Sequence, residues 1–147
     1  MEISTITVRH YAPEGTLCEP VRQTAETLNT LVIELGAKLA RMGFPVTLEN
    51  VSSNGEPEKN NMVTMECLEI DFPETPLDEI LGFQASARPC ECASGTGPEK
   101  CRTIEIGDDS YQAVPPGLIA DGLLRVALSA TGGCGSGCGT CGGCGTS

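Results

Sequence analysis

An apolar stripe with helical spacing over residues 21–42 constrains the fold more than any other feature of the sequence. Its members recur at alternating steps of four and three residues: Val21, Ala25, Leu28, Val32, Leu35, Leu39 and Met42. That spacing places them on one face of an α-helix, which must be buried against another element. Gly43 follows the stripe as a C-terminal stop, and Gly36 within it indicates close packing against a neighbour.

Strand-like segments lie on both sides of this helix. Residues 3–11, "ISTITVRHY", are rich in β-branched side chains and alternate Ile6 and Val8 with threonines. Residues 45–51, "PVTLENV", form the second such segment. Because a helix separates the two strands, we expect them to be parallel and joined by a right-handed crossover.

The remaining elements complete an α/β pattern. We predict a strand over 62–70, a short helical turn over 75–82, a β-hairpin over 102–114 that turns at "GDD", and a helix over 115–130. A hairpin adds an antiparallel edge, so the predicted sheet is mixed, with four to five strands in the order β-α-β then β-β-α. The inward face of the last helix is expected to carry Leu118, Ile119, Gly122, Leu123 and Val126.

One segment of this domain has no periodicity. Residues 83–101 contain Cys90, Cys92 and Cys101 and show neither helical nor strand spacing. We therefore expect a cysteine-bearing loop there that is either unordered or organised by a ligand.

The charge balance limits the partners. The chain has 20 acidic and 9 basic residues and a formal net charge of −11, which repels phosphate backbones and anionic lipid surfaces. We therefore expect neither nucleic acid nor a membrane as a partner. No basic leader precedes an apolar run, and no stretch reaches the roughly 18 apolar residues of a membrane span, so we expect a cytoplasmic protein with reduced thiols.

Cys18 carries a resemblance to a known fold. A β-α-β half followed by a β-β-α half, with a cysteine at the start of the first helix, resembles the thioredoxin fold. In "TLCEPV", Cys18, Glu19, Pro20 and Val21 stand in the place of the C-x-P-C motif of that fold.

The likeness is closer to one uncharacterised prokaryotic family of small thioredoxin-like domains. The matching stretches are "TITVRHY", "PLDEILG", the cysteine-bearing loop that runs into "CRTIEI", and "SYQAVPPGLI". They cover nearly all of residues 1–130, which we predict to be one thioredoxin-like domain, and leave out the Gly- and Cys-rich tail of residues 131–147.

Two departures from the resemblance argue against an ordinary dithiol oxidoreductase. Val21 stands where thioredoxins carry the resolving cysteine, so Cys18 has no partner three residues away. The proline that usually precedes the third strand is also missing from "KNNMV". Whether the chain is an enzyme is left open.

The nine cysteines have different predicted roles. Cys18 lies at a helix start, where the positive end of the helix dipole stabilises a thiolate, so it is the candidate reactive sulfur; the alternative is a vestigial thiol. Cys67 alternates with Val63 and Met65 on the strand of residues 62–70 and is expected to be core. His10, the single histidine, is expected to be a packed or surface residue rather than a ligand.

Cys90, Cys92 and Cys101 form a C-x-C-x8-C set. With a fourth sulfur such as Cys18, three thiolates can hold zinc tetrahedrally or ligate an iron–sulfur cluster. The alternatives are a mobile loop without a ligand and an occasional Cys90–Cys101 disulfide.

The tail has the spacing C-x3-C-x2-C-x2-C, formed by Cys134, Cys138, Cys141 and Cys144 among glycine, serine and threonine. Glycine supplies no apolar shell for an iron–sulfur cluster, but it suits an adaptable thiolate nest for Cu(I), Zn(II) or a similar thiophilic ion. The alternative is a low-complexity linker.

These observations predict a thioredoxin-like protein that binds a thiophilic metal or metalloid through its loop and tail cysteines. One alternative is a monothiol redox protein in which Cys18 forms mixed disulfides with a thiol-bearing protein. Another is a non-catalytic interaction domain.

Overall fold

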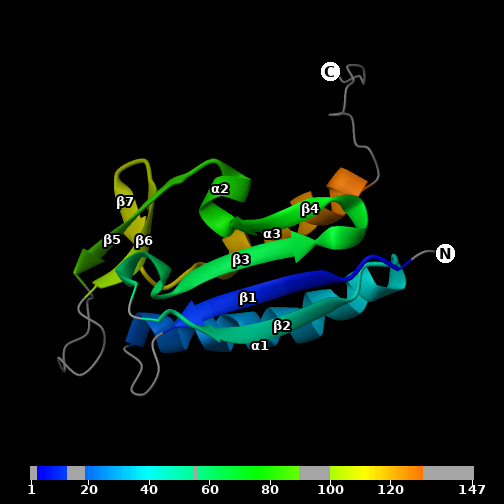
Figure 1. The fold of residues 1–147 in the computed structure, drawn as a ribbon, viewed down its shortest axis with the longest axis horizontal. Coiled ribbons are helices and arrows are strands. Elements are labelled where there is room, and N and C mark those ends of the chain that lie inside the picture. Colours follow the sequence, from blue (N-terminus) through cyan, green and yellow to red (C-terminus); the bar gives the residue numbers. More distant parts are fainter. Residues whose placement is uncertain (1–2, 13–18, 55, 90–99, 131–147) are drawn as a thin grey trace.

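The computed structural model describes residues 3–12, 19–54, 56–89 and 100–130 (Figure 1). Its main sheet has the order β2-β1-β3-β4. The strands are β1 (Ile6–Ala12), β2 (Val46–Ser52), β3 (Met62–Cys67) and β4 (Phe72–Pro76). β1 is parallel to β2 and antiparallel to β3, which is antiparallel to β4. The predicted mixed α/β fold is confirmed, and this topology is consistent with a thioredoxin-like fold.

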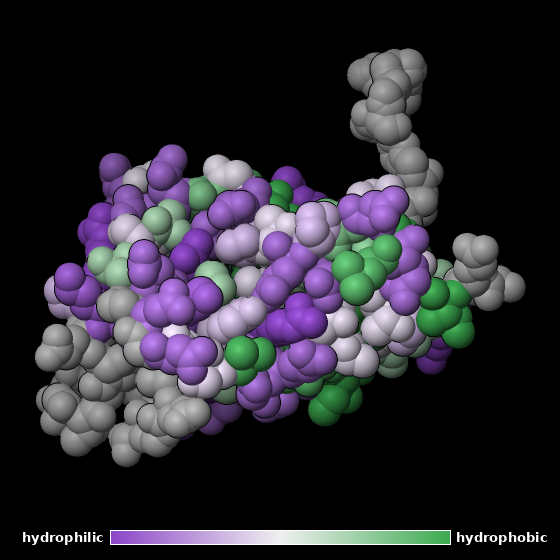
Figure 2. Space-filling model, viewed as in Figure 1, coloured by the Kyte–Doolittle hydropathy of each residue, from purple (hydrophilic) through white to green (hydrophobic). Residues whose placement is uncertain are grey.

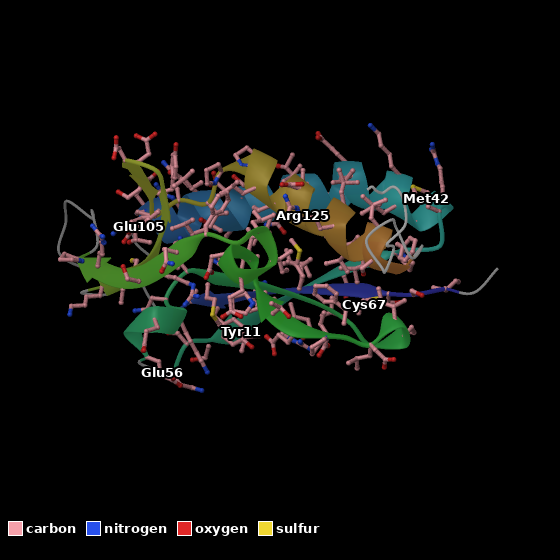
Figure 3. All side chains as sticks on the ribbon, turned by 90° about the horizontal axis from the view of Figure 1, so that it is seen from above. Tyr11, Met42, Glu56, Cys67, Glu105 and Arg125 are labelled. Carbon is pink, nitrogen blue, oxygen red and sulfur yellow. The ribbon has the colours of Figure 1, made fainter. Side chains whose placement is uncertain are left out.

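Two helices cover one face of the main sheet (Figures 1 and 3). In α1 (Glu19–Arg41), the stripe buries Val21, Leu28 and Leu39. Met42, its last predicted member, lies beyond the end of the helix and is 57% exposed. In α3 (Pro116–Ala130), the inward face is as predicted, with Ile119, Gly122, Leu123 and Val126 buried and Leu118 packed against the core.

Of the two glycines singled out in the α1 region, Gly43 has the predicted role. A Cβ added to Gly36 would lie 3.6 Å from Cβ of Val46, an ordinary contact, so α1 packs on β2 at this point without requiring a glycine. Gly43 ends the helix with a φ of +93°, a backbone conformation that glycine adopts at little cost.

A separate antiparallel sheet of β5 (Gln84–Pro89), β6 (Lys100–Ile106) and β7 (Asp109–Tyr111) corrects two predictions. The hairpin is confirmed and turns at Gly107, but it belongs to this second sheet and not to an edge of the main sheet. The predicted loop over 83–101 is wrong at both ends, because residues 84–89 and 100–101 are strand. The half-buried face of β5 carries only Ala85 and Ala87, and the strand is paired along its length with β6, so its alternation is a weak signal.

The fourth strand of the main sheet was not predicted. β4 contains Pro73 and Pro76, which usually argue against a strand, but it lies at an edge of the sheet where proline is tolerated. The predicted strand 62–70 ends at Cys67 and is followed by a 3₁₀ turn, Leu68–Ile70. The predicted helical turn after β4 is confirmed as α2 (Leu77–Leu81).

The other face of the main sheet is mainly hydrophilic, with apolar side chains toward one end (Figure 2). Arg9 of β1 lies among three carboxylates and forms ion pairs with Glu49, Glu66 and Glu74. Tyr11 donates a hydrogen bond to the Glu74 carboxylate, and burial, reinforced by that carboxylate, raises the pKa of Tyr11 to about 12. Among the described residues, no helix combines the length and apolar content needed to cross a bilayer.

Candidate functional site

Cys101 lies at the beginning of β6, and its side chain is fully buried. It packs against Val21 in the first turn of α1, and Ala12 at the end of β1 packs against this pair. Val21 stands where thioredoxins carry the resolving cysteine. The structure places the sulfur of Cys101 beside this position. Cys101 thus lies in strand β6, next to the start of α1, and not in a loop.

The two segments that carry Cys18, Cys90 and Cys92 both connect to the chain beside Cys101. Residues 13–18 follow Ala12 and precede α1, and residues 90–99 follow Pro89 and precede Lys100. Pro89 and Lys100 are cross-strand partners, next to the pair Arg88 and Cys101. Cys18, Cys90 and Cys92 themselves lie outside the described residues, as do Cys134, Cys138, Cys141 and Cys144.

The first turns of α1 are fixed by a buried threonine. The Thr24 hydroxyl donates to the Pro20 carbonyl at 3.0 Å and accepts from the Val114 amide, also at 3.0 Å. This ties the start of α1 to the segment that leads into α3. A helix N-terminus carries unpaired N–H groups and the positive end of the dipole, so a thiolate near it is stabilised.

Two adjacent asparagines connect the main sheet to the second sheet. The Asn60 side chain donates to the Lys100 carbonyl at 2.8 Å, and the Arg102 amide donates to the Asn60 carbonyl at 2.7 Å. Ser53 donates its hydroxyl to Oδ1 of Asn60 at 2.6 Å. The backbone on both sides of Cys101 is therefore bound to one residue.

His10 and Asn61 form a second buried polar contact near this end of β1. Asn61 has a φ of +72°, and its Nδ2 donates to the carbonyl of Gln112. Gln112 in turn donates to the carbonyl of Pro89 at 2.8 Å. Desolvation by burial lowers the pKa of His10, with the hydrogen bond to Asn61 opposing the shift. His10 is therefore a packed core residue, one of the two alternatives expected.

Arg102, the residue after Cys101, is anchored to α2. Its Nε and Nη2 each donate to one oxygen of Asp78 at 3.0 Å, and its Nη1 donates to the carbonyl of Glu58 at 3.0 Å. A bidentate pair of this kind fixes the geometry of both side chains. It therefore holds the beginning of β6 against the rest of the domain.

The described part of the chain does not itself contain a complete metal centre: it holds no group of three or more His, Cys, Asp or Glu side chains placed to bind an ion. Cys67 is fully buried in the core, as predicted. Burial, followed by the nearby Glu69 carboxylate, raises the pKa of the Cys67 thiol and so favours its protonated form. Of the cysteines that were predicted to bind metal, the structure therefore describes Cys101 alone.

The contacts of Asn60 and Asn61 were missed by the sequence analysis. The stretch "KNNMV" was interpreted only through its lack of proline, although its two asparagines make the contacts described above. Two consecutive amide side chains directly before a buried strand were the available signal. Asparagine tolerates a positive φ and carries both a donor and an acceptor, so it suits a buried junction.

The sheet order and the helices on one face define a small mixed α/β protein whose topology is consistent with a thioredoxin-like fold. Residues 5–122 match the family described as "Domain of unknown function (DUF2703)", which is more than half of the chain, and the protein belongs to this family. Comparison with curated proteins and with solved structures gave no match.

Proposed function

We propose that this protein binds a thiophilic metal or metalloid ion through cysteine thiolates in the cytoplasm. The observation that supports this most is the place of Cys101 beside Ala12 and Val21. The two segments that carry Cys18, Cys90 and Cys92 connect to the chain at the same end of the fold. The proposed ligands are Cys90, Cys92 and Cys101 in one group and Cys134, Cys138, Cys141 and Cys144 in the tail.

The chemistry of the donors selects the ion. Thiolates are soft ligands that favour Zn(II) and Cu(I), and an iron–sulfur cluster is a further candidate for the group of three cysteines. A fully buried sulfur such as that of Cys101 excludes water from its side of an ion. Because thiols must lose their protons to bind, loading is expected to release protons and to weaken at low pH.

Elemental analysis of protein purified without oxygen tests this proposal. We expect the parent to carry metal and the Cys90→Ser, Cys92→Ser, Cys101→Ser variant to carry less. Cys67→Ala is the matched control, because it also removes a buried thiol but lies in the main core. Equal metal content in the parent and the triple variant would contradict a role for these three cysteines.

A second candidate is thiol–disulfide exchange at Cys18, and the contact between Cys101 and Val21 favours it. The Cys18 thiolate would attack a disulfide of a partner protein, form a mixed disulfide and release one partner thiolate. A loop or tail thiolate would then attack the Cys18 sulfur. That step forms an intramolecular disulfide and releases the second partner thiolate, so two electrons pass from this chain to the partner.

A further inference from the structure

Asn60 lies against one edge of β6, at a point where no strand of the described chain pairs with it. β7 pairs with β6 only from Ile104 to Ile106. In a strand, residues two apart direct their N–H and C=O groups to the same edge, so Lys100 and Arg102 face the same side as Ile104. Asn60 binds the carbonyl of Lys100 with its side chain and the amide of Arg102 with its backbone. It therefore replaces a paired strand at the two residues that flank Cys101.

The orientation of Asn60 is fixed from the main sheet. The Ser53 hydroxyl donates to Oδ1 of Asn60, so the nitrogen of this amide is the group that faces Lys100. The Ser53 amide donates to the carbonyl of Ala12 at 2.9 Å, and the Asn61 amide donates to the carbonyl of Tyr11 at 2.7 Å. Asn60 thus stands between two residues that are both bound to the end of β1.

We infer that Asn60 is the positioning residue of the thiol site, holding the Cys101 sulfur against the end of β1 and the start of α1. This inference rests on the proposed metal-binding function. A ligand whose backbone is bound on both sides is already in place before the ion arrives, so little ordering cost remains for binding. Removing a residue that orients a metal ligand in this way typically weakens metal affinity by about 10- to 100-fold.

Three variants separate this role from a general effect on stability. Asn60→Ala removes the side-chain bond to Lys100 and the acceptor for Ser53. Asn60→Asp keeps the size and the acceptor, but it points a carboxylate oxygen at the Lys100 carbonyl, so we expect it to be at least as damaging at neutral pH. Val126→Ala is the matched control, because Val126 is fully buried in α3, in the main core and not beside Cys101.

The first measurement is the affinity for Cd(II), followed through sulfur-to-metal charge-transfer absorption in the full chain with its four tail cysteines changed to Ser. We expect both Asn60 variants to bind Cd(II) about 10- to 100-fold more weakly, with the same number of thiolates, and Val126→Ala to bind as the parent does. Unchanged affinity in Asn60→Ala would overturn the inference. Failure of the parent to bind Cd(II) would instead overturn metal binding by the group of three cysteines.

The second measurement does not depend on any metal. In chains that retain Cys101 as their only cysteine, native-state alkylation reports how often this sulfur becomes exposed. We expect Asn60→Ala to raise the rate by about tenfold, since the lost hydrogen bonds hold the backbone beside this sulfur. An equal rise in Val126→Ala would show that Asn60 affects only the stability of the whole domain, and it would overturn the positioning role.

Discussion

His10 donates its Nε2 proton to Oδ1 of Asn61 across 2.8 Å, and both side chains are buried. The direction of this bond follows from the Asn61 amide, whose nitrogen is already occupied by the carbonyl of Gln112. Nε2 of His10 therefore carries a proton, and burial lowers the pKa of the ring, which favours its neutral form. A buried neutral histidine makes the stability of the fold depend on pH.

Acid should destabilise this protein through His10. Unfolding returns the pKa of His10 from its lowered value to about 6.5, so the unfolded chain binds more protons in the interval between the two values. The contribution of His10 to stability is complete above about pH 6.5 and is lost as the pH falls below it towards the folded pKa.

Urea unfolding between about pH 5 and pH 8 measures this dependence. His10→Gln keeps a donor for Asn61 and removes the titration, so we expect a loss of about 1 kcal/mol at pH 8 and a flatter profile below it. Because His10 is the only histidine of the chain, no other imidazole can produce the slope. An identical profile in the variant would mean that the buried ring does not titrate on unfolding.

The features that could be predicted from the sequence are those that depend on residue spacing within a single segment. α1 was found because the spacing of Val21, Leu28 and Leu39 is visible without any partner, and Cys67 was assigned to the core from simple alternation. β5 gives a much weaker signal, since only Ala85 and Ala87 alternate with its polar residues and its order comes from backbone bonds to β6. A segment of small and polar residues becomes a strand only when its partner is present.

The position of Cys101 could not be predicted for a related reason. Its side chain packs against Ala12 and Val21, and the backbone on either side of it binds Asn60, so its contacts come from three other parts of the chain. Amide contacts such as those of Asn60 are non-local and have no characteristic spacing. The candidate site could therefore be anticipated as a set of cysteines, but not as an arrangement held by asparagines.

Two glycines in helices should respond in opposite ways to alanine. At Gly36 the added Cβ meets Val46 at an ordinary 3.6 Å, so Gly36→Ala should stabilise the fold by about 0.5 to 1 kcal/mol through helix propensity. At Gly122 the Cβ would overlap the terminal methyl of Leu77 and lie 3.1 Å from Met65, and both side chains are fully buried. Gly122→Ala should therefore destabilise by about 1 kcal/mol or more, despite its propensity gain. Chemical unfolding checks both variants. A Gly122→Ala variant that is more stable than the parent would show that α2 can shift to make room for the added methyl group.

Breaking the Asp78–Arg102 pair should loosen α2 and β6 together. Asp78→Asn leaves the Arg102 guanidinium, whose side chain is only 15% exposed, without its counter-charge, and we expect a loss of about 3 kcal/mol. The double variant Asp78→Asn, Arg102→Met should lose less than the sum of the two single variants, because no unpaired charge remains. Additive losses in such a cycle would mean that the pair contributes no coupling energy.

Cys18 should have a lowered pKa if it serves in thiol exchange. It immediately precedes Glu19, the first residue of α1, where the helix dipole favours a thiolate. In a chain that retains only Cys18, the rate of alkylation should rise with a midpoint clearly below about 8.5, the value of a free cysteine. A midpoint at or above that value would remove the argument for the redox candidate and leave metal binding as the remaining role for this sulfur.

The tail should contribute metal binding without contributing stability. Residues 131–147 contain no large apolar side chain, so deleting them should leave the free energy of unfolding of the metal-free protein almost unchanged. The bound metal should fall substantially in the deletion variant, because four thiols are removed with it.

Changing Cys134, Cys138, Cys141 and Cys144 together to Ser is the matched control, since it keeps the length and removes only the sulfurs. The two variants should then bind equally little, because only deprotonated thiols are proposed to act. Equal metal content in the parent and the four-serine variant, under reducing conditions, would make the tail a linker and assign all binding to the cysteines of the domain.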